Sequence, residues 1–306
     1  MMKKTPPASG QEGHASGIIM NDHSNLTTPQ PSDIRLSANL GFLWAELPLP
    51  EAIRHAAAAG FDAVECHFPY QTAAAETRRA LEETGLPMIA INTSAGDRKA
   101  GQFGLAALAG QQQAARAAID QAMEYANAVA ALHIHVMPGI ASGAEAEACF
   151  VENLDYACSL GRQAGISILI EPICSDAVPG YFLANCHQAE MLQDKLQHDN
   201  LKMMLDCFHA AMTEGADWLA ENLPRLLPSI GHIQFAGVPD RGPPDRGLIN
   251  YSRLFGSLSS QGYHGGLGAE YRPMPASSPT EQSLGWMPGL RAALGHGQAM
   301  TAELTD

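Results

Sequence analysis

Residues 167–172 read Ser-Ile-Leu-Ile-Glu-Pro, a short apolar run of strand type that ends on an acid. Three later apolar runs end on an oxygen-bearing side chain in the same way: Asp206 follows Met203-Met204-Leu205, Gln234 follows His232-Ile233, and Glu270 follows Leu267-Gly268-Ala269. A polar group at the carboxyl end of a buried strand is where a barrel of alternating strands and helices keeps its chemistry. The pattern therefore favours such a barrel, with its functional groups gathered at one end.

Short apolar runs alternate with longer helical segments along the rest of the chain. The predicted strands are 34–40, 63–68, 88–92, 131–137, 167–173, 201–208, 232–238 and 266–271. The predicted helices are 50–59, 72–84, 111–130, 144–164, 188–196, 218–227, 251–261 and 279–293. Eight strand–helix units predict an α/β protein built as a single (β/α)8 TIM barrel. No G-x-G-x-x-G follows the first strand, which argues against a dinucleotide-binding sheet.

The chain divides into three predicted segments. Residues 1–33 are rich in Pro, Ser and Gly and are expected to form a disordered N-terminal extension, within which Met20 is a second candidate start. Residues 34–295 form the barrel, and residues 296–306 are a C-terminal tail. The apolar run 17–20 is too short for a signal peptide, and no run reaches the roughly 18 apolar residues of a membrane span. The six cysteines form no C-x-x-C pair and are expected to be free thiols, so we expect a cytoplasmic protein away from membranes.

The charge balance restricts the partners. The formal net charge is −14, and no Lys/Arg cluster is visible. An acidic chain repels a phosphate backbone, so nucleic acid is not expected as a partner. The apolar stripes left on the Ala-rich helices are compatible with a homo-oligomer, although the sequence does not determine the oligomeric state.

The four polar strand ends predict a metal site. Side chains alternate faces along a strand, so each polar group shares the inner face with the residue two positions before it: Leu169, Met204, His232 and Gly268. Glu171, Asp206, Gln234 and Glu270 would then lie at one level on neighbouring strands. Four oxygen ligands favour Mg²⁺ or Mn²⁺ over zinc, with a carboxylate base beside the ion. The competing interpretation is that these acids cap strand ends and pair with arginines.

Further candidates lie near the same end of the barrel. His133 and His135 share a face of the fourth strand, where lining the pocket and filling the core are both open to them. Asn92 ends the third strand and is a candidate substrate contact, as is His209 in the predicted exit loop of the sixth strand. Long loops at 95–110 and 237–250 carry arginines that could reach an anionic substrate.

Several of these motifs together resemble the hydroxypyruvate isomerase family of the xylose-isomerase-like barrels. The motifs are Ile170-Glu171-Pro172, Asp206-x-x-His209, His232-Ile233-Gln234 and Glu270-Tyr271-Arg272-Pro273, with Phe68-Pro69-Tyr70, Ala95-Gly96-Asp97, Val151-Glu152-Asn153-Leu154, Asp240-Arg241-Gly242 and Asn250-Tyr251 between them. The likeness runs from about Ile34 to Trp286. Leu248, where the family usually has an acid, and Pro243-Pro244 depart from the pattern and affect the distal substrate contacts.

The resemblance implies an isomerase of the aldose–ketose type acting on a small anionic sugar acid. It implies that Glu171 and Glu270 transfer the proton through an enediolate, and that Glu171, Asp206, Gln234 and Glu270 hold the metal. His209 and Arg241 would hold substrate oxygens, and Arg241, Arg272 or both would anchor the carboxylate.

The substrate remains open at this stage. Interconversion of hydroxypyruvate and 2-hydroxy-3-oxopropanoate is the first expectation, and an isomerase of a four-carbon 2-oxo acid is its nearest rival. A sugar epimerase on the same scaffold ranks lower, because such enzymes usually have His where Gln234 stands. A DNA-repair endonuclease, which needs several zinc ions and a basic groove, and a non-catalytic binding barrel rank lower still.

Overall fold

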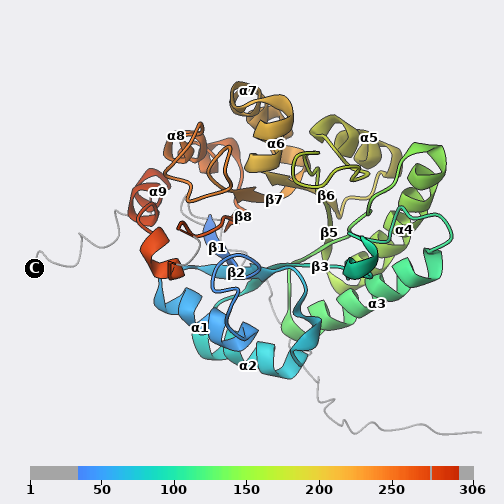
Figure 1. The fold of residues 1–306 in the computed structure, drawn as a ribbon, viewed down its shortest axis with the longest axis horizontal. Coiled ribbons are helices and arrows are strands. Elements are labelled where there is room, and N and C mark those ends of the chain that lie inside the picture. Colours follow the sequence, from blue (N-terminus) through green and yellow to red (C-terminus); the bar gives the residue numbers. More distant parts are fainter. Residues whose placement is uncertain (1–33, 276–277, 296–306) are drawn as a thin grey trace, which may run out of the picture. The chain divides into compact units, whose positions relative to one another are not determined.

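A computed structural model describes residues 34–275 and 278–295 of the chain. Within these ranges eight parallel strands close into a barrel in the order β1 to β8, and helices surround the strands (Figure 1). The predicted (β/α)8 fold is confirmed. The segments 1–33 and 296–306, which the sequence predicts to be a disordered extension and a tail, lie outside the described residues.

The strands fall within or close to the eight apolar runs of the sequence. They are β1 (Arg35–Asn39), β2 (Ala63–Cys66), β3 (Met88–Asn92), β4 (His133–His135), β5 (Ser167–Ile170), β6 (Leu201–Asp206), β7 (Ile230–Phe235) and β8 (Gly266–Ala269). The strand β7 begins two residues earlier than predicted. Asp206 pairs with Gln234 in the register of β6 and β7, and Gln234 pairs with Gly268 in that of β7 and β8. The register therefore sets two of the predicted metal ligands side by side.

Nine α-helices and five short 3₁₀ turns connect and cover the strands within the described ranges. The helices are α1 (Leu49–Ala58), α2 (Ala74–Thr84), α3 (Gln112–Val129), α4 (Gly143–Ala164), α5 (Cys186–Leu196), α6 (Cys207–Glu214), α7 (Ala216–Leu226), α8 (Tyr251–Phe255) and α9 (Met287–Ala293). Gly85 and Gly165 end α2 and α4 with φ of 72°, the left-handed conformation that a helix terminus requires. The predicted helices 251–261 and 279–293 are each broken in two.

The prediction was wrong at the end of the sixth strand. Residues 201–208 are expected to be extended, but β6 ends at Asp206 and α6 begins at the next residue. The Asp206 carboxylate accepts a hydrogen bond from the Phe208 N–H at 2.8 Å and so caps the helix. As a result His209 lies in the first turn of α6 and not in an exit loop.

The alternation of faces along the strands is confirmed. Leu169 and Met204 point into the barrel and pack with Ala63, Ile89 and Ala90 in a small inner core. Ile168 and Ile170 belong instead to the large core between strands and helices. The inner core fills the barrel below the carboxyl ends of the strands. The polar side chains two positions after Leu169 and Met204, those of Glu171 and Asp206, therefore lie above this core, at the open end of the barrel.

Two predictions about the whole chain concern thiols and membranes. All six cysteines are free, and five of them are buried, as expected for apolar packing positions. In the part of the chain that the structure covers, none of the helices combines the length and the apolar character needed to cross a bilayer.

Candidate active site

A cavity of about 320 Å³ opens at the carboxyl ends of the strands. Its lining includes six of the residues singled out from the sequence: Asn92, Glu171, His209, Arg241, Glu270 and Arg272. The other three predicted residues, His135, Asp206 and Gln234, are buried and contact or adjoin this group without lining the cavity. The structure therefore gathers side chains from six strands and their loops at one place.

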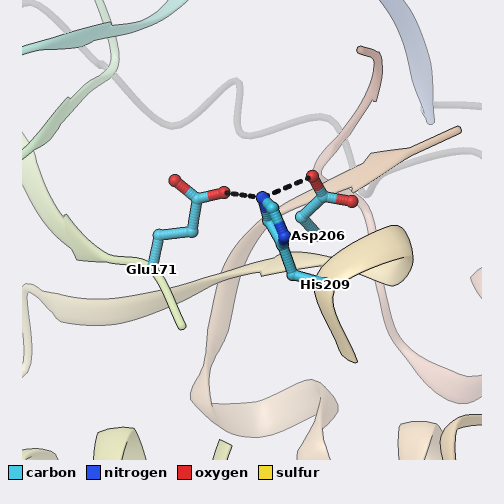
Figure 2. A group of neighbouring side chains, drawn as sticks. All are labelled: Glu171, Asp206 and His209. Atoms are coloured by element: carbon cyan, nitrogen blue, oxygen red, sulfur yellow. Dashed lines mark ion pairs between the residues drawn. The ribbon is translucent and has the colours of Figure 1, made fainter. Parts of the chain in front are cut away.

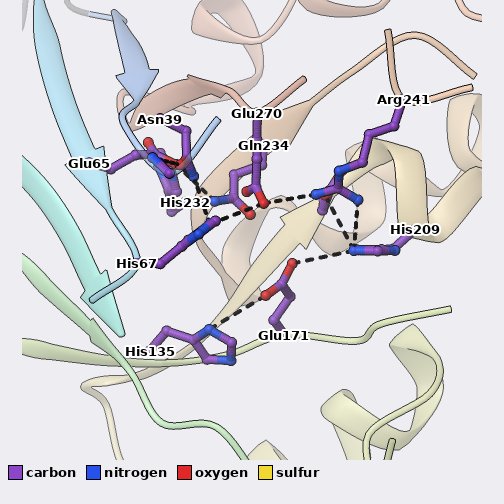
Figure 3. A network of polar contacts seen from close by, with 12 residues as sticks. Asn39, Glu65, His67, His135, Glu171, His209, His232, Gln234, Arg241 and Glu270 are labelled. Atoms are coloured by element: carbon purple, nitrogen blue, oxygen red, sulfur yellow. Dashed lines mark hydrogen bonds and ion pairs between the residues drawn. The ribbon is translucent and has the colours of Figure 1, made fainter. Parts of the chain in front are cut away.

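The guanidinium of Arg241 connects two of the acids. Its Nη2 atom donates to Asp206 Oδ2 and to Glu270 Oε1, each at 2.8 Å, and its Nη1 atom lies 2.9 Å from His209 Nε2 (Figure 3). Arg241 is only 7% exposed and adopts φ of 55°, in the left-handed region. A buried arginine in this backbone conformation is held by the surrounding carboxylates, because an unpaired buried charge would be very costly.

Glu171 faces the same group from the opposite side. Its carboxylate lies 3.4 Å from His135 Nδ1 and 4.0 Å from His209 Nε2, and His209 Nε2 lies 3.6 Å from Asp206 Oδ2. Figure 2 shows the His209 ring between the two carboxylates. One ligand atom from each of Glu171, Asp206 and His209 falls within 4.8 Å of the others, close enough to share one cation.

The hydrogen bonds determine the tautomer of His209. Arg241 can only donate, so the Nε2 atom of His209 accepts its hydrogen bond and carries no proton. The proton then resides on Nδ1, which lies 3.1 Å from the Cys174 sulfur. The Nε2 lone pair of His209 is thus used by Arg241, and a substrate hydroxyl or metal ion at this atom would have to replace that hydrogen bond.

The pKa values of Glu171 and Glu270 are shifted in opposite directions. Burial, together with the negative charges of Glu270 and Asp206, raises the pKa of Glu171 well above its ordinary value. Burial also acts to raise the pKa of Glu270, but Arg241 and His67 outweigh it and bring this pKa to about 2. Two carboxyl groups whose environments drive their acidities apart are suited to act as an acid and a base.

Two histidines beside the acids, His135 and His209, are neutral. Burial is the main cause that lowers the pKa of His135 and of His209 to about 3. Asp206 is also affected by burial, which raises its pKa to about 6 in spite of Arg241. Arg241 is therefore the principal positive charge among three buried carboxyl groups.

The donor set fits a hard divalent cation. Asp206 and Glu270 carry two negative charges against the one positive charge of Arg241, an imbalance that burial makes unfavourable without a further cation. Gln234 donates its Nε2 to Glu65, so its Oε1 atom points away from Glu65, and this buried oxygen has no hydrogen-bond partner among the described residues. Glu270 Oε2 is likewise buried without such a partner in the same ranges. Unpaired buried oxygens beside surplus negative charge are what Mg²⁺ or Mn²⁺ would satisfy.

Arginines also line the mouth of the cavity. Arg98 lies in a 3₁₀ turn (Arg98–Ala100) of the long loop after β3 and stacks on the Phe103 ring, with 4.6 Å from its guanidinium carbon to the ring centre. Arg272 follows β8. Within the ranges 34–275 and 278–295 no carboxylate pairs with Arg98 or Arg272, so both are available to an anionic ligand. The sequence indicated the loop of Arg98 but not this residue.

Three further polar residues, from the first two strands, belong to the same network. Glu65 and His67 lie on and just after β2, and Asn39 ends β1. His67 lies 3.3 Å from Glu270, and Glu65 binds the Gln234 amide. In the sequence, the feature that could have indicated this network is Glu65, a single acid inside the apolar run Ala63-Val64-Glu65-Cys66.

The barrel and this cluster define a class of protein that comparison with known families identifies. Residues 53–290 match the xylose isomerase-like TIM barrel family, and the chain belongs to it. It is 40% identical over 257 residues to the 2-oxo-tetronate isomerase of Cupriavidus necator, covering 83% of this chain and 97% of the relative. It is 41% identical over 265 residues to a putative hydroxypyruvate isomerase of Danio rerio, covering 83% and 94%.

A solved structure supports the same assignment of fold. The crystal structure described as an AP endonuclease, family 2, from Brucella melitensis superposes with a TM-score of 0.79 at 36% identity, covering 83% of this chain and 98% of that one. The relatives carry isomerase names, and the protein is an isomerase of the aldose–ketose type.

Proposed function

We propose that this isomerase interconverts hydroxypyruvate and 2-hydroxy-3-oxopropanoate. The observation that carries the proposal is the meeting of two buried glutamates, Glu171 and Glu270, at a cavity whose mouth bears two arginines. The arginines match a substrate carboxylate, and the glutamates match a proton transfer between adjacent carbons.

The proton transfer balances without any oxidant or reductant. Starting from hydroxypyruvate, a base removes one proton from C3, and the electron pair forms the C2–C3 double bond of an enediolate. A proton then adds to C2, while the hydroxyl proton on the C3 oxygen moves to the C2 oxygen. The product is an aldehyde at C3 and a hydroxyl at C2, with the carboxylate unchanged.

The two glutamates take different roles in this scheme. One of Glu171 and Glu270 accepts the proton from C3 in this direction, and the other supplies a proton to C2. The reverse reaction exchanges the two roles. Because one carboxyl group takes the proton and another gives it, the product acquires a proton that has exchanged with solvent.

A divalent cation, Mg²⁺ or Mn²⁺, would be held by Glu171, Asp206, Gln234 and Glu270. Bound there, it would polarise the substrate oxygens and stabilise the negative charge that develops on them. His209 Nε2 lies beside Asp206 and Glu171 and would become a further donor once its hydrogen bond from Arg241 is broken.

The substrate carboxylate is assigned to the arginines at the mouth. Arg98 and Arg272 are exposed and free of carboxylates within the described ranges, whereas Arg241 is already bound to two acids. We therefore place the carboxylate at Arg98 and Arg272, with Arg241 facing the reacting oxygens. The net charge of −14 and the buried acids Glu171, Asp206 and Glu270 at the site do not favour a phosphodiester substrate.

A second candidate substrate is 2-oxo-tetronate, which the Cupriavidus necator relative favours by its name. The same transfer from C3 to C2 applies to it, because the two substrates differ only in a hydroxymethyl group on C3. A cavity of about 320 Å³ has room for either acid.

Proton NMR in D₂O tests the proposal. Purified protein with Mn²⁺ or Mg²⁺ is incubated with hydroxypyruvate and, separately, with 2-oxo-tetronate, before and after chelation. Enzyme-dependent deuterium uptake next to the carbonyl establishes the enediolate, and the faster substrate is the preferred one. No uptake on either acid by folded, metal-treated protein would refute the proposed reaction.

A further inference from the structure

Glu65 is a buried acid at the closed side of the cluster, away from the cavity lining. It lies on β2, is 1% exposed, and has no arginine or lysine partner within the described ranges. Its Oε2 atom lies 2.8 Å from His232 Nε2, while its Oε1 atom accepts from Gln234 Nε2 at 2.8 Å and from Asn39 Nδ2 at 3.2 Å. Figure 3 shows these side chains around the Glu65 carboxylate. A buried carboxylate with three N–H partners is stabilised as the anion.

This carboxylate determines how its neighbours are oriented. An ionised carboxylate only accepts, so all three side chains around Glu65 must present N–H groups to it. Asn39 is fixed independently, because its Oδ1 atom accepts from the Gly41 N–H at 2.9 Å and so leaves the amide nitrogen for Glu65. Gln234 has no such second anchor within the described ranges, since its Oε1 atom is unpaired there.

The direction of the Gln234 amide therefore depends on Glu65. With its nitrogen bound to Glu65, the amide turns its oxygen away from that carboxylate, as a metal ligand requires. Without an acceptor at this place, the amide could rotate and present its N–H₂ group, which repels a cation.

A glycine on β8 provides the space that Glu65 occupies. A Cβ atom at Gly268 would lie 2.5 Å from Glu65 Oε2 and 2.6 Å from Glu65 Oε1. The φ of Gly268 is not in the left-handed region, so its backbone would accept another residue, and the three atoms nearest to an added Cβ all belong to the Glu65 carboxylate. The absence of a side chain at Gly268 therefore leaves the space that the Glu65 carboxylate needs, although the two residues lie far apart in the sequence.

A second connection runs from the same carboxylate towards the catalytic acid. The Asn39 amide nitrogen also lies 3.3 Å from His67 Nε2. His67 Nε2 in turn lies 3.3 Å from Glu270 Oε1. Glu65 thus adjoins one proposed metal ligand directly and a second one through two side chains.

We propose that Glu65 is a positioning residue that holds the Gln234 oxygen towards the acid cluster and thereby sets the affinity of the site for its divalent cation. The proposal rests on the metal site of the proposed function and deepens it. A residue that served only as a partner of His232 would use only its Oε2 atom. Glu65 also uses its Oε1 atom, which accepts hydrogen bonds from Gln234 and Asn39.

The experiment measures binding of Mn²⁺ to the purified full-length protein, by the EPR signal of the free ion. Glu65→Leu removes the acceptor, and Glu65→Gln keeps one acceptor oxygen for the Gln234 amide. Gly268→Ala displaces the carboxylate without removing it. Gly289→Ala, at a helix position where a Cβ meets nothing within 4 Å, is the matched glycine control.

We expect Glu65→Leu and Gly268→Ala to weaken Mn²⁺ binding by about 10-fold to 100-fold, the usual effect of removing a group that orients a metal ligand. Glu65→Gln should recover most of the affinity, and Gly289→Ala should match the wild type. If Glu65→Leu does not fold, the Gly268→Ala result decides alone.

Two results would overturn the inference. One is folded Glu65→Leu or Gly268→Ala protein that binds Mn²⁺ within about twofold of the wild type. The other is a Glu65→Gln protein as weak as Glu65→Leu, which would assign the effect to charge and not to the hydrogen bond. Wild-type protein that binds no Mn²⁺ would instead remove the metal site of the proposed function, a failure visible before any variant is compared.

Discussion

Replacing Arg241 by methionine removes the cation that holds the acid cluster together. The guanidinium is 7% exposed and bonds Asp206 and Glu270 at 2.8 Å each. Methionine keeps an unbranched apolar stem like that of arginine, and it has the same left-handed backbone conformation to adopt at this position. The difference between the two proteins therefore reports on the lost charge and its hydrogen bonds.

The expected loss of unfolding free energy is about 3–5 kcal/mol, the usual effect of breaking a buried ion pair from one side. The acidity of Glu270 gives a similar magnitude. A pKa that falls from 4.5 to about 2 in the folded protein corresponds to about 3 kcal/mol of stabilisation of the anion.

The pH dependence adds a second signature. Because the folded pKa of Glu270 is below its ordinary value, this stabilisation is fully present above about pH 4.5 and is lost as the pH falls towards 2. Arg241→Met lacks the largest contribution to this lowering, so the two stability curves should differ most near neutral pH and converge in acid.

Urea denaturation of metal-free protein is the assay, with Arg225→Met as the control. Arg225 forms an exposed ion pair with Glu190, a kind of pair worth at most about 1 kcal/mol. Added Mn²⁺ should restore part of the stability of Arg241→Met, because a bound cation replaces the missing charge. A loss for Arg241→Met no larger than that for Arg225→Met would refute the account of the cluster.

Three further outcomes follow from the site and the barrel interior. Glu171→Gln and Glu270→Gln should each lower turnover and deuterium uptake by at least about 1000-fold with the fold intact by circular dichroism, and near-normal turnover in either would remove its assigned role. Gln234→Leu should weaken Mn²⁺ binding by at least about 10-fold, whereas His209→Leu should chiefly raise KM; the opposite pattern would exchange their roles. Burial lowers the pKa of His133 to about 3, so its neutral state stabilises the fold above pH 6.5, and this contribution is lost as the pH falls towards 3. Between pH 7.5 and 5.5, His133→Gln should therefore lose about 1.4 kcal/mol less stability than the wild type in urea titrations, and equal losses would contradict the lowered pKa of His133.

The barrel could be predicted because its signal is local and repeated. Apolar runs of strand length, separated by helical segments, require only the period of side chains along each element. The same period placed Leu169 and Met204 inside the barrel, as the structure confirms. The helix α6 was missed because Cys207 and Phe208 continue the apolar run of β6, and only the Asp206 cap marks the boundary.

The site could be predicted in part. Glu171, Asp206 and Glu270 meet because the carboxyl ends of parallel strands meet at one end of a closed barrel. Pairing of these acids with arginines is the competing interpretation of the sequence, and Arg241 does bind two of them. That Arg241 is the arginine could not be predicted, because its loop has no periodic pattern and its position depends on where the charges lie in space.

The sequence by itself determined the number of strand–helix units, the faces of the strands and the acids at the strand ends, because neighbouring residues impose these features through backbone geometry. The tertiary structure alone decided that Gly268 leaves room for Glu65, which then orients Gln234. It also decided that the two glutamates differ in acidity. Such contacts join residues about 30 to 200 positions apart, and their energies depend on burial and on distances between charges that exist only once the barrel has closed.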